Sequence, residues 1–213
     1  MIENGEKTLW GIHAGRTGDA ETLFLKKNFV ALGWPQVGDL SKIGGDREAF
    51  KARVSAIYPD KSPPAVANNA GQLFRFVHEM NPGDLVVFPS KSDRRVNIGK
   101  IVSEYRYDPS TDSAYPNMRK VDWLKSVPRT HFTQGALFEI GSAISLFQVK
   151  TYADEFRAAI ADKPAAAAPV EKDATIAAVA QDIEDTTKDF VLKTLARETK
   201  GLAFEGVILH LLE

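Results

Sequence analysis

The spacing of apolar residues changes repeatedly between strand-like and helical along the first 160 positions. Short apolar runs bounded by turn signals predict strands at 8–14, 29–34, 85–91, 97–107, 119–127 and 138–140. Helical spacing predicts helices at 19–27, 46–58 and 65–80. The stretch 146–160 fits either a strand followed by a helix or one helix, and Asn81-Pro82-Gly83-Asp84 is a strong turn signal. Several short strands with peripheral helices predict an α+β fold built on a curved sheet or small barrel.

The last fifty residues have a different pattern. The stretch 161–174, ADKPAAAAPVEKDA, combines two prolines with an alanine run and reads as a semi-rigid spacer. Residues 186–213 then show two short amphipathic helical patterns separated at Gly201. We therefore predict a domain at 1–160, a linker at 161–185 and a short helical C-terminal segment at 186–213.

Composition narrows the class of protein. The 213 residues are 44% hydrophobic and 26% charged, which suffices for one sizeable core and a smaller piece. There is no cysteine, which excludes disulfides and thiolate metal sites. No run reaches the roughly 18 apolar residues that span a bilayer, and the first ten residues lack the apolar core of a signal peptide. We expect a cytoplasmic protein with no membrane partner.

Residue patterns for catalysis are weak. The four histidines show no metal-ligand spacing, and neither a Gly-x-Ser-x-Gly motif nor a phosphate-binding glycine loop occurs. We therefore predict no catalytic residue, metal or cofactor in this chain. The net charge of -1 gives no global electrostatic case for nucleic acid, so any such case must rest on local clusters.

The segment FVLKTLARETKGLAFEGVILHLLE, which contains Phe204 and Glu205, resembles the entry to the nuclease domain of Mrr-type restriction endonucleases. In that family an Asp and a Glu-x-Lys signature bind the metal downstream of this point. The resemblance implies that 186–213 begins a truncated nuclease domain, whose missing part would use Mg²⁺. The alternatives are a helical hairpin that docks on the main domain and a segment that mediates homo-oligomerisation through its apolar faces.

The first domain resembles the PUA-like superfamily, and within it the EVE and YTH types. The resemblance rests on the order of LGW, NPGDLVVFPSK, IGKI and RKVDWLKSVP. The stretch GRTGDAETLFLKKNFVALGW, followed by GDLSKI, is similar to EVE-like sensors that precede nucleases in modification-dependent restriction. Together these motifs span most of residues 8–150. The resemblance implies binding of double-stranded DNA with a modified base, which is flipped into an aromatic pocket.

The chain offers three tryptophans as walls of such a pocket. Trp34, where a strand meets a Pro-containing turn, is the first candidate; Trp10, beside Gly11, and Trp123 follow. Each stacking contact contributes roughly 1–3 kcal/mol, so two or three walls would offset the cost of unstacking. Tryptophans in a small barrel are also frequent core residues, and that reading stays open for all three. Ser90 is a candidate for hydrogen bonding to a base edge.

Candidate phosphate ligands lie in two loops. Arg16 directly precedes a predicted helix, and Lys91, Arg94 and Arg95 occupy the loop PSKSDRRVN, where Asp93 dilutes the positive charge. A second basic stretch contains Arg119, Lys120, Lys125 and Arg129.

Two functions follow as expectations. The first is the DNA-recognition part of a restriction endonuclease that senses methylated or otherwise modified bases. The second is an RNA-binding or small-ligand-binding PUA-like module fused to another effector.

Overall fold

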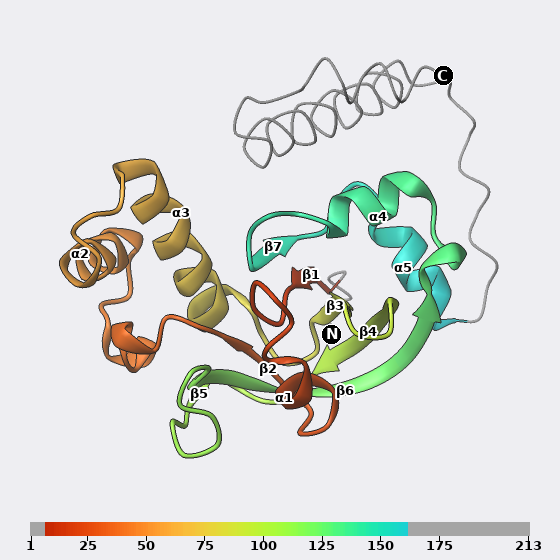
Figure 1. Ribbon diagram of the computed structural model, residues 1–213, viewed down its shortest axis with the longest axis horizontal. Coiled ribbons are helices and arrows are strands. Elements are labelled where there is room, and N and C mark those ends of the chain that lie inside the picture. The colour runs from red at the N-terminus through yellow and green to blue at the C-terminus, as the bar shows by residue number, and fades with distance from the viewer. Residues whose placement is uncertain (1–6, 162–213) are drawn as a thin grey trace, which may run out of the picture. The chain divides into compact units, whose positions relative to one another are not determined.

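The computed structural model describes residues 7–161 (Figure 1). They belong to the first of two compact units, Met1–Ala166 and Ala167–Glu213. Nearly all of the predicted linker and the whole of the predicted segment 186–213 lie outside the described residues.

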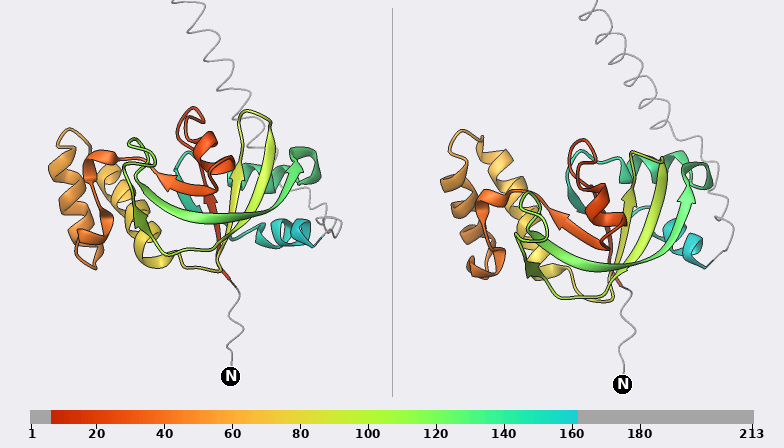
Figure 2. Two further views of the ribbon diagram at one scale, coloured as in Figure 1. Left: turned by 90° about the horizontal axis from the view of Figure 1, so that it is seen from below. Right: turned by 60° about the horizontal axis from the view of Figure 1, so that its bottom comes forward.

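A single mixed sheet forms the centre of the described part. Its strands are β1 (Leu9–Ile12), β2 (Phe29–Leu32), β3 (Leu85–Pro89), β4 (Arg95–Ile101), β5 (Arg106–Tyr107), β6 (Asn117–Pro128) and β7 (Leu146–Gln148). They are ordered β2-β6-β4-β3-β1-β7, with β5 paired to β6, and only β1 and β3 pair in parallel. The long strand β6 bends across the sheet, which curls into a half-barrel (Figure 2). The predicted α+β class with a curved sheet is confirmed.

Helices surround this sheet. They are α1 (Glu21–Leu25), α2 (Arg47–Ile57), α3 (Pro63–Phe74), α4 (Gln134–Ile140) and α5 (Ala153–Ile160). Short 3₁₀ turns occupy Pro35–Val37, Leu40–Lys42 and Arg129–His131, and a π-helical turn, Arg75–Glu79, continues α3. Figure 1 shows α2 and α3 together at one end, and α4 and α5 at the other. The strand predicted at 138–140 is wrong, because these residues lie in α4, where the Thr133 side chain accepts the Ala136 N–H as an N-cap.

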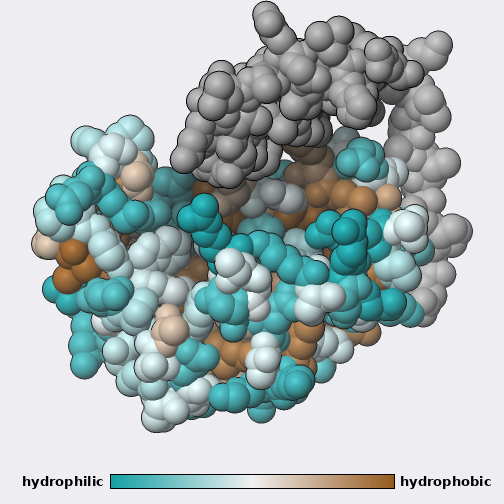
Figure 3. Space-filling view, in the orientation of Figure 1, coloured by the Kyte–Doolittle hydropathy of each residue, from teal (hydrophilic) through white to brown (hydrophobic). Residues whose placement is uncertain are grey.

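Apolar side chains pack on both faces of the central strands. Leu9 and Val87 belong to one cluster with Phe156 of α5, whereas Trp10 and Val86 belong to the other. Neighbouring residues of a strand point to opposite faces, so β1 and β3 are buried on both sides. Hydrophilic residues cover most of the visible surface of the described part, with apolar patches between them (Figure 3).

The predicted turn at 81–84 is held by a buried carboxylate. Asp84 accepts a hydrogen bond from the Trp10 indole Nε1 at 3.0 Å and another from the Asn81 backbone N–H at 2.9 Å. The turn therefore fixes the start of β3 against β1.

Arg119, which the sequence places in a basic stretch, is a core residue with 1% of its surface exposed. Its guanidinium group donates to the backbone carbonyls of Phe76, Val77 and Ser103 at 2.9, 3.1 and 3.2 Å. Burial of the guanidinium group lowers its pKa, and the nearby Glu104 acts in the opposite direction. Arg119 therefore joins β6 to the π-helical turn and is not available to a ligand.

Candidate functional site

Three adjoining cavities form one groove, which we call the basic groove. The central cavity has a volume of about 760 Å³ and extends into a smaller one of about 150 Å³; His13, Gly15, Arg16, Trp34 and Ser145 line both. On the other side it meets a cavity of about 710 Å³, and Arg129, Gly141, Ser142 and Ala143 line both of these. The groove therefore runs from Trp34 to the start of α4.

Every ionised side chain that lines the basic groove carries positive charge. These residues are Arg16, Lys61, Lys91, Arg94 and Arg129, and no aspartate or glutamate lines the three cavities. Within residues 7–161 none of the five forms an ion pair. A chain whose net charge is -1 therefore presents a local cationic surface here.

The cations of the groove also affect the pKa of His13. The imidazole ring of this residue lies 5.8 Å from the ring of Phe147. Burial is the main cause of its lowered pKa, and Lys91 and Arg129 lower it further, against an opposing contribution from the Ser142 backbone. The imidazole is therefore neutral near pH 7. Its Nε2 atom is buried and has no hydrogen-bond partner among the described residues.

Trp34 lines both the central and the small cavity, and its backbone is strained. Its φ of 61° is left-handed, a conformation that is rare for a bulky residue and is disfavoured again by the following Pro35. The conformation is held by the 3₁₀ turn that begins here, in which Val37 N–H donates to the Trp34 carbonyl at 3.0 Å. The indole is half-buried and so retains a surface toward the groove.

Tyr115 is a second aromatic wall, which sequence reasoning missed. It lines the small cavity together with Trp34, and its hydroxyl donates to the Asp19 carboxylate, 96 positions away. A Cβ at Gly15, where φ is 78°, would lie 2.2 Å from that hydroxyl, so the close approach of this ring requires glycine. The hydrogen bond from Tyr115 lowers the pKa of Asp19, whereas burial and then Asp19 raise that of Tyr115. No local sequence signal identifies Tyr115, because only the fold brings it to Gly15.

Lys91 reaches the groove because a carboxylate fixes its loop. Glu21, in the first turn of α1, accepts the backbone N–H of Lys91 at 2.5 Å and that of Ser92 at 3.3 Å. The Ser90 hydroxyl also lies 3.3 Å from this carboxylate, and Ser90 is fully buried. The Lys91 ammonium group donates to the Arg16 carbonyl, which links the two basic loops.

The other predicted site residues do not line the basic groove. Trp10 is a core residue with 1% exposure, and Trp123 donates its Nε1 hydrogen to the Phe24 carbonyl at 2.8 Å. The Arg95 guanidinium group is bound to Ser126, with Nε 2.9 Å from the hydroxyl. Of the eight predicted residues the structure brings together Arg16, Trp34, Lys91 and Arg94. It leaves Trp10, Ser90, Arg95 and Trp123 outside the three cavities.

Residues 7–161 contain neither a metal-binding cluster nor a membrane-spanning helix. No cluster of three histidine, aspartate or glutamate side chains there is arranged to hold a metal ion. No helix in this part of the chain is both long and apolar enough to cross a bilayer.

Comparison with known proteins gives one match. A family described as a domain of unknown function, DUF8426, matches residues 10–141, which is more than half of the chain. The matched range contains all five groove cations, together with Trp34 and Tyr115. No curated protein and no solved structure matches the chain.

Proposed function

The chain belongs to the DUF8426 family, and we propose that it recognises DNA that carries a modified base by holding that base, flipped out of the duplex, in the basic groove. One observation carries the proposal: a strained tryptophan and a tyrosine border a groove whose ionised lining groups are all cations.

The central cavity suits a nucleotide in size and in wall chemistry. Its volume of about 760 Å³ is within the range of roughly 300–1,000 Å³ that is usual for small-molecule sites. Trp34 lines both this cavity and the smaller one beside it, and Tyr115 lines the smaller one, so the pair supplies aromatic faces on which a base can stack. Each stacking contact contributes roughly 1–3 kcal/mol, so the pair offsets the few kcal/mol that a base loses on leaving the duplex.

In this proposal the cations of the groove contact the backbone of the extruded nucleotide. Arg16 and Lys91 stand beside Trp34 in the central cavity, and their loops are tied together by the hydrogen bond between them. Phosphate contacts of this kind orient a duplex without reading its sequence. Discrimination between modified and unmodified bases would therefore come from Trp34 and Tyr115.

The sequence resemblances extend the proposal to the whole protein. The PUA-like motifs include Gly15, Arg16, Trp34, Pro89 and Lys91 of this groove, and the C-terminal resemblance is to the entry of an Mrr-type nuclease domain. In this proposal the recognition part acts in the cytoplasm and directs a Mg²⁺-dependent nuclease domain to foreign modified DNA.

The test is a binding titration by fluorescence anisotropy at one fixed salt concentration. One duplex is compared unmodified and with 5-methylcytosine, 5-hydroxymethylcytosine or N6-methyladenine at a single position, together with an RNA of the same sequence. We expect tighter binding to one modified duplex, and loss of that preference in Trp34→Ala. The matched control is Tyr107→Ala, which removes an aromatic side chain that is 38% exposed on β5, outside the groove.

Two results would overturn the proposal. Equal binding to every duplex would show that only phosphates are contacted. Tighter binding to the RNA than to any DNA would show that the basic groove binds RNA, as in the alternative function.

A further inference from the structure

Two arginines face each other at the α4 end of the basic groove. The antiparallel register of β4 and β6 pairs Arg95 with Pro128 at the end of the ladder. Arg94 and Arg129 are the next residues outward on each side, so the register places them opposite each other. Both residues lie just outside the ladder, Arg94 in the loop before β4 and Arg129 at the start of the 3₁₀ turn Arg129–His131. Two cations held close together repel each other.

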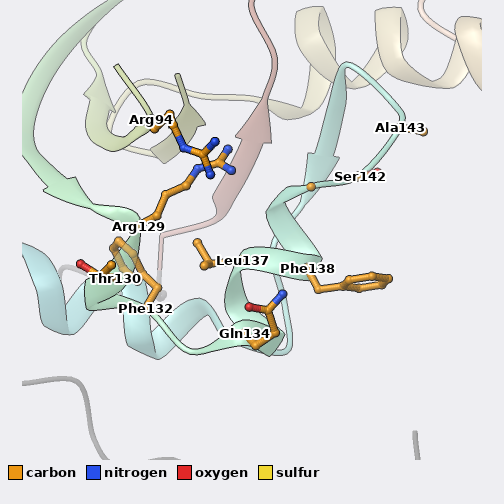
Figure 4. Close-up of a pocket in the computed structure, with 10 residues that line it drawn as sticks. Arg94, Arg129, Thr130, Phe132, Gln134, Leu137, Phe138, Ser142 and Ala143 are labelled. Atoms are coloured by element: carbon orange, nitrogen blue, oxygen red, sulfur yellow. The ribbon is translucent and has the colours of Figure 1, made fainter. Parts of the chain in front are cut away.

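Both side chains turn into the same cavity. Arg94 and Arg129 line the cavity of about 710 Å³, and Figure 4 shows their guanidinium groups directed toward the same part of it. The side chains of Thr130 and Gln134 add polar groups to its lining. No carboxylate lines this cavity, and neither arginine forms an ion pair within residues 7–161.

Two further features of this arginine pair are energetically unfavourable. Arg129 is half-buried, and its Nε atom is buried with no hydrogen-bond partner in the described part of the chain. Arg94 has a φ of 57°, a left-handed conformation that is uncommon for a residue with a side chain. A buried donor without a partner and two opposed cations are both relieved when an anion binds between them.

We propose that Arg94 and Arg129 form a clamp for one phosphodiester of the nucleic-acid backbone, next to the nucleotide held at Trp34. This inference rests on the proposed function. We call the cavity of about 710 Å³ the arginine cavity. The clamp and Trp34 belong to one groove, because Arg129 and the segment 141–143 line both the arginine cavity and the central cavity. Guanidinium groups bind phosphate through parallel N–H bonds, and a pair of them suits a group with two unesterified oxygens.

The clamp is distinct in role from the aromatic walls Trp34 and Tyr115. Removing it should weaken binding to modified and unmodified duplexes equally and leave the preference between them intact, because a phosphate contact carries no base information. Suitable variants are Arg129→Gln and Arg94→Asn, since asparagine tolerates the left-handed backbone at position 94. Lys100→Gln is the control, with the same change of charge at an exposed position of β4.

The first measurement needs no nucleic acid. The thermal midpoint of the full chain is followed in sodium phosphate and in sodium chloride of equal ionic strength. We expect phosphate to raise the midpoint of the wild type and of Lys100→Gln, and to have a smaller effect on Arg129→Gln and Arg94→Asn. Equal effects of the two salts on the wild type, or an undiminished phosphate effect in both arginine variants, would overturn the clamp.

The second measurement locates the phosphate. Duplexes with a neutral methylphosphonate at one linkage at a time are titrated against the wild type and the double variant Arg94→Asn, Arg129→Gln. We expect one linkage near the modified base at which the substitution weakens wild-type binding about tenfold or more, and has no further effect on the double variant. The slope of log Kd against log salt should fall by about 0.9 for the lost contact.

The outcomes separate the two proposals. A selective phosphate effect in a chain that binds no duplex would show that the two arginines bind an anion, but would overturn both the proposed DNA function and the assignment of the anion to a phosphodiester. Modification-dependent binding with an unchanged salt slope in the double variant would support the DNA function and overturn the clamp. Arg129→Lys retains the charge without the planar fork, and only partial recovery of affinity is expected from it.

Discussion

Replacing Arg119 by methionine tests whether the buried guanidinium group holds the sheet to the helical layer. Within the π-helical turn Arg75–Glu79, the Met80 N–H donates to the Arg75 carbonyl, whereas the Asn81 N–H donates to Asp84. The Phe76 and Val77 carbonyls are therefore left without helical donors, and Arg119 supplies them from β6. A cation at the C-terminal end of a helix is also favoured by the helix dipole.

The structure sets the size of the effect. Three hydrogen bonds from a charged donor, at about 1.5 kcal/mol each, give a loss of about 4.5 kcal/mol. Methionine also relieves the desolvation of the guanidinium group, so we expect a net loss of about 3 kcal/mol in the free energy of unfolding. The contact with Glu104, 3.7 Å from Nη1, contributes little because the Glu104 side chain is 81% exposed.

The assay is urea denaturation of the full chain, followed by circular dichroism, with the slope m compared between variants. Lys120→Met is the matched control, because it makes the same type of change at the next, exposed position of β6 and should alter stability by no more than about 0.5 kcal/mol. Arg119→Lys should give an intermediate loss, since the ammonium group cannot reach three carbonyls in a fork. A loss below about 1 kcal/mol in Arg119→Met, with m unchanged, would refute the reasoning.

Three further predictions concern the groove. Gly15→Ala places a Cβ 2.2 Å from the Tyr115 hydroxyl at a φ of 78°, so it should cost more than about 1 kcal/mol of stability and reduce the preference for modified DNA; an unchanged urea midpoint would contradict this. Glu21→Gln should speed hydrogen exchange of the Lys91 and Ser92 amides and weaken DNA binding, whereas the neighbouring exposed change Thr22→Ala should do neither. Burial lowers the pKa of His13, so below the ordinary value of 6.5 the unfolded chain binds a proton at this histidine more readily than the folded chain does. The free energy of unfolding should therefore be constant with respect to His13 above pH 6.5 and fall as the pH drops below it. The same slope in His13→Gln would show that another group is responsible.

Local patterns predicted the fold well where they were long or chemically unambiguous. The turn at 81–84, the helices near 46–58 and 65–80 and the strand within β6 were all identified from the sequence. The error at 138–140 has a local cause, since three residues cannot distinguish strand from helix and the capping signal of Thr133 was overlooked. The strand predicted to run to residue 107 ends at Ile101, after a register shift between Ile98 and Gly99.

The site was predicted only in part, because a groove is made by register and long-range contact. Trp34, Lys91 and Arg94 stand next to turns, and turn chemistry is visible in a sequence. Arg94 and Arg129 lie close together only because β4 pairs with β6. Tyr115 contacts Gly15 only because a loop distant in sequence folds against it. Conversely Trp10 and Arg119 look available in the sequence, and only the buried partners Asp84 and Phe76 show that they are structural.

Backbone strain connects the two ends of the groove. Within residues 7–161 three residues other than glycine have a positive φ, namely Asn28, Trp34 and Arg94. Asparagine tolerates this conformation, whereas a tryptophan before proline and an arginine do not, at a cost on the order of 1–3 kcal/mol each. Both strained residues line the basic groove. Trp34 lines the central cavity, and Arg94 lines the arginine cavity. A fold under selection for stability alone would place glycine or asparagine at these two turns. The chain carries Trp34 and Arg94 there instead, and in our proposals these side chains contact the base and the phosphate of one bound nucleotide. Their shared backbone strain is an argument, independent of charge, for assigning both cavities to one ligand.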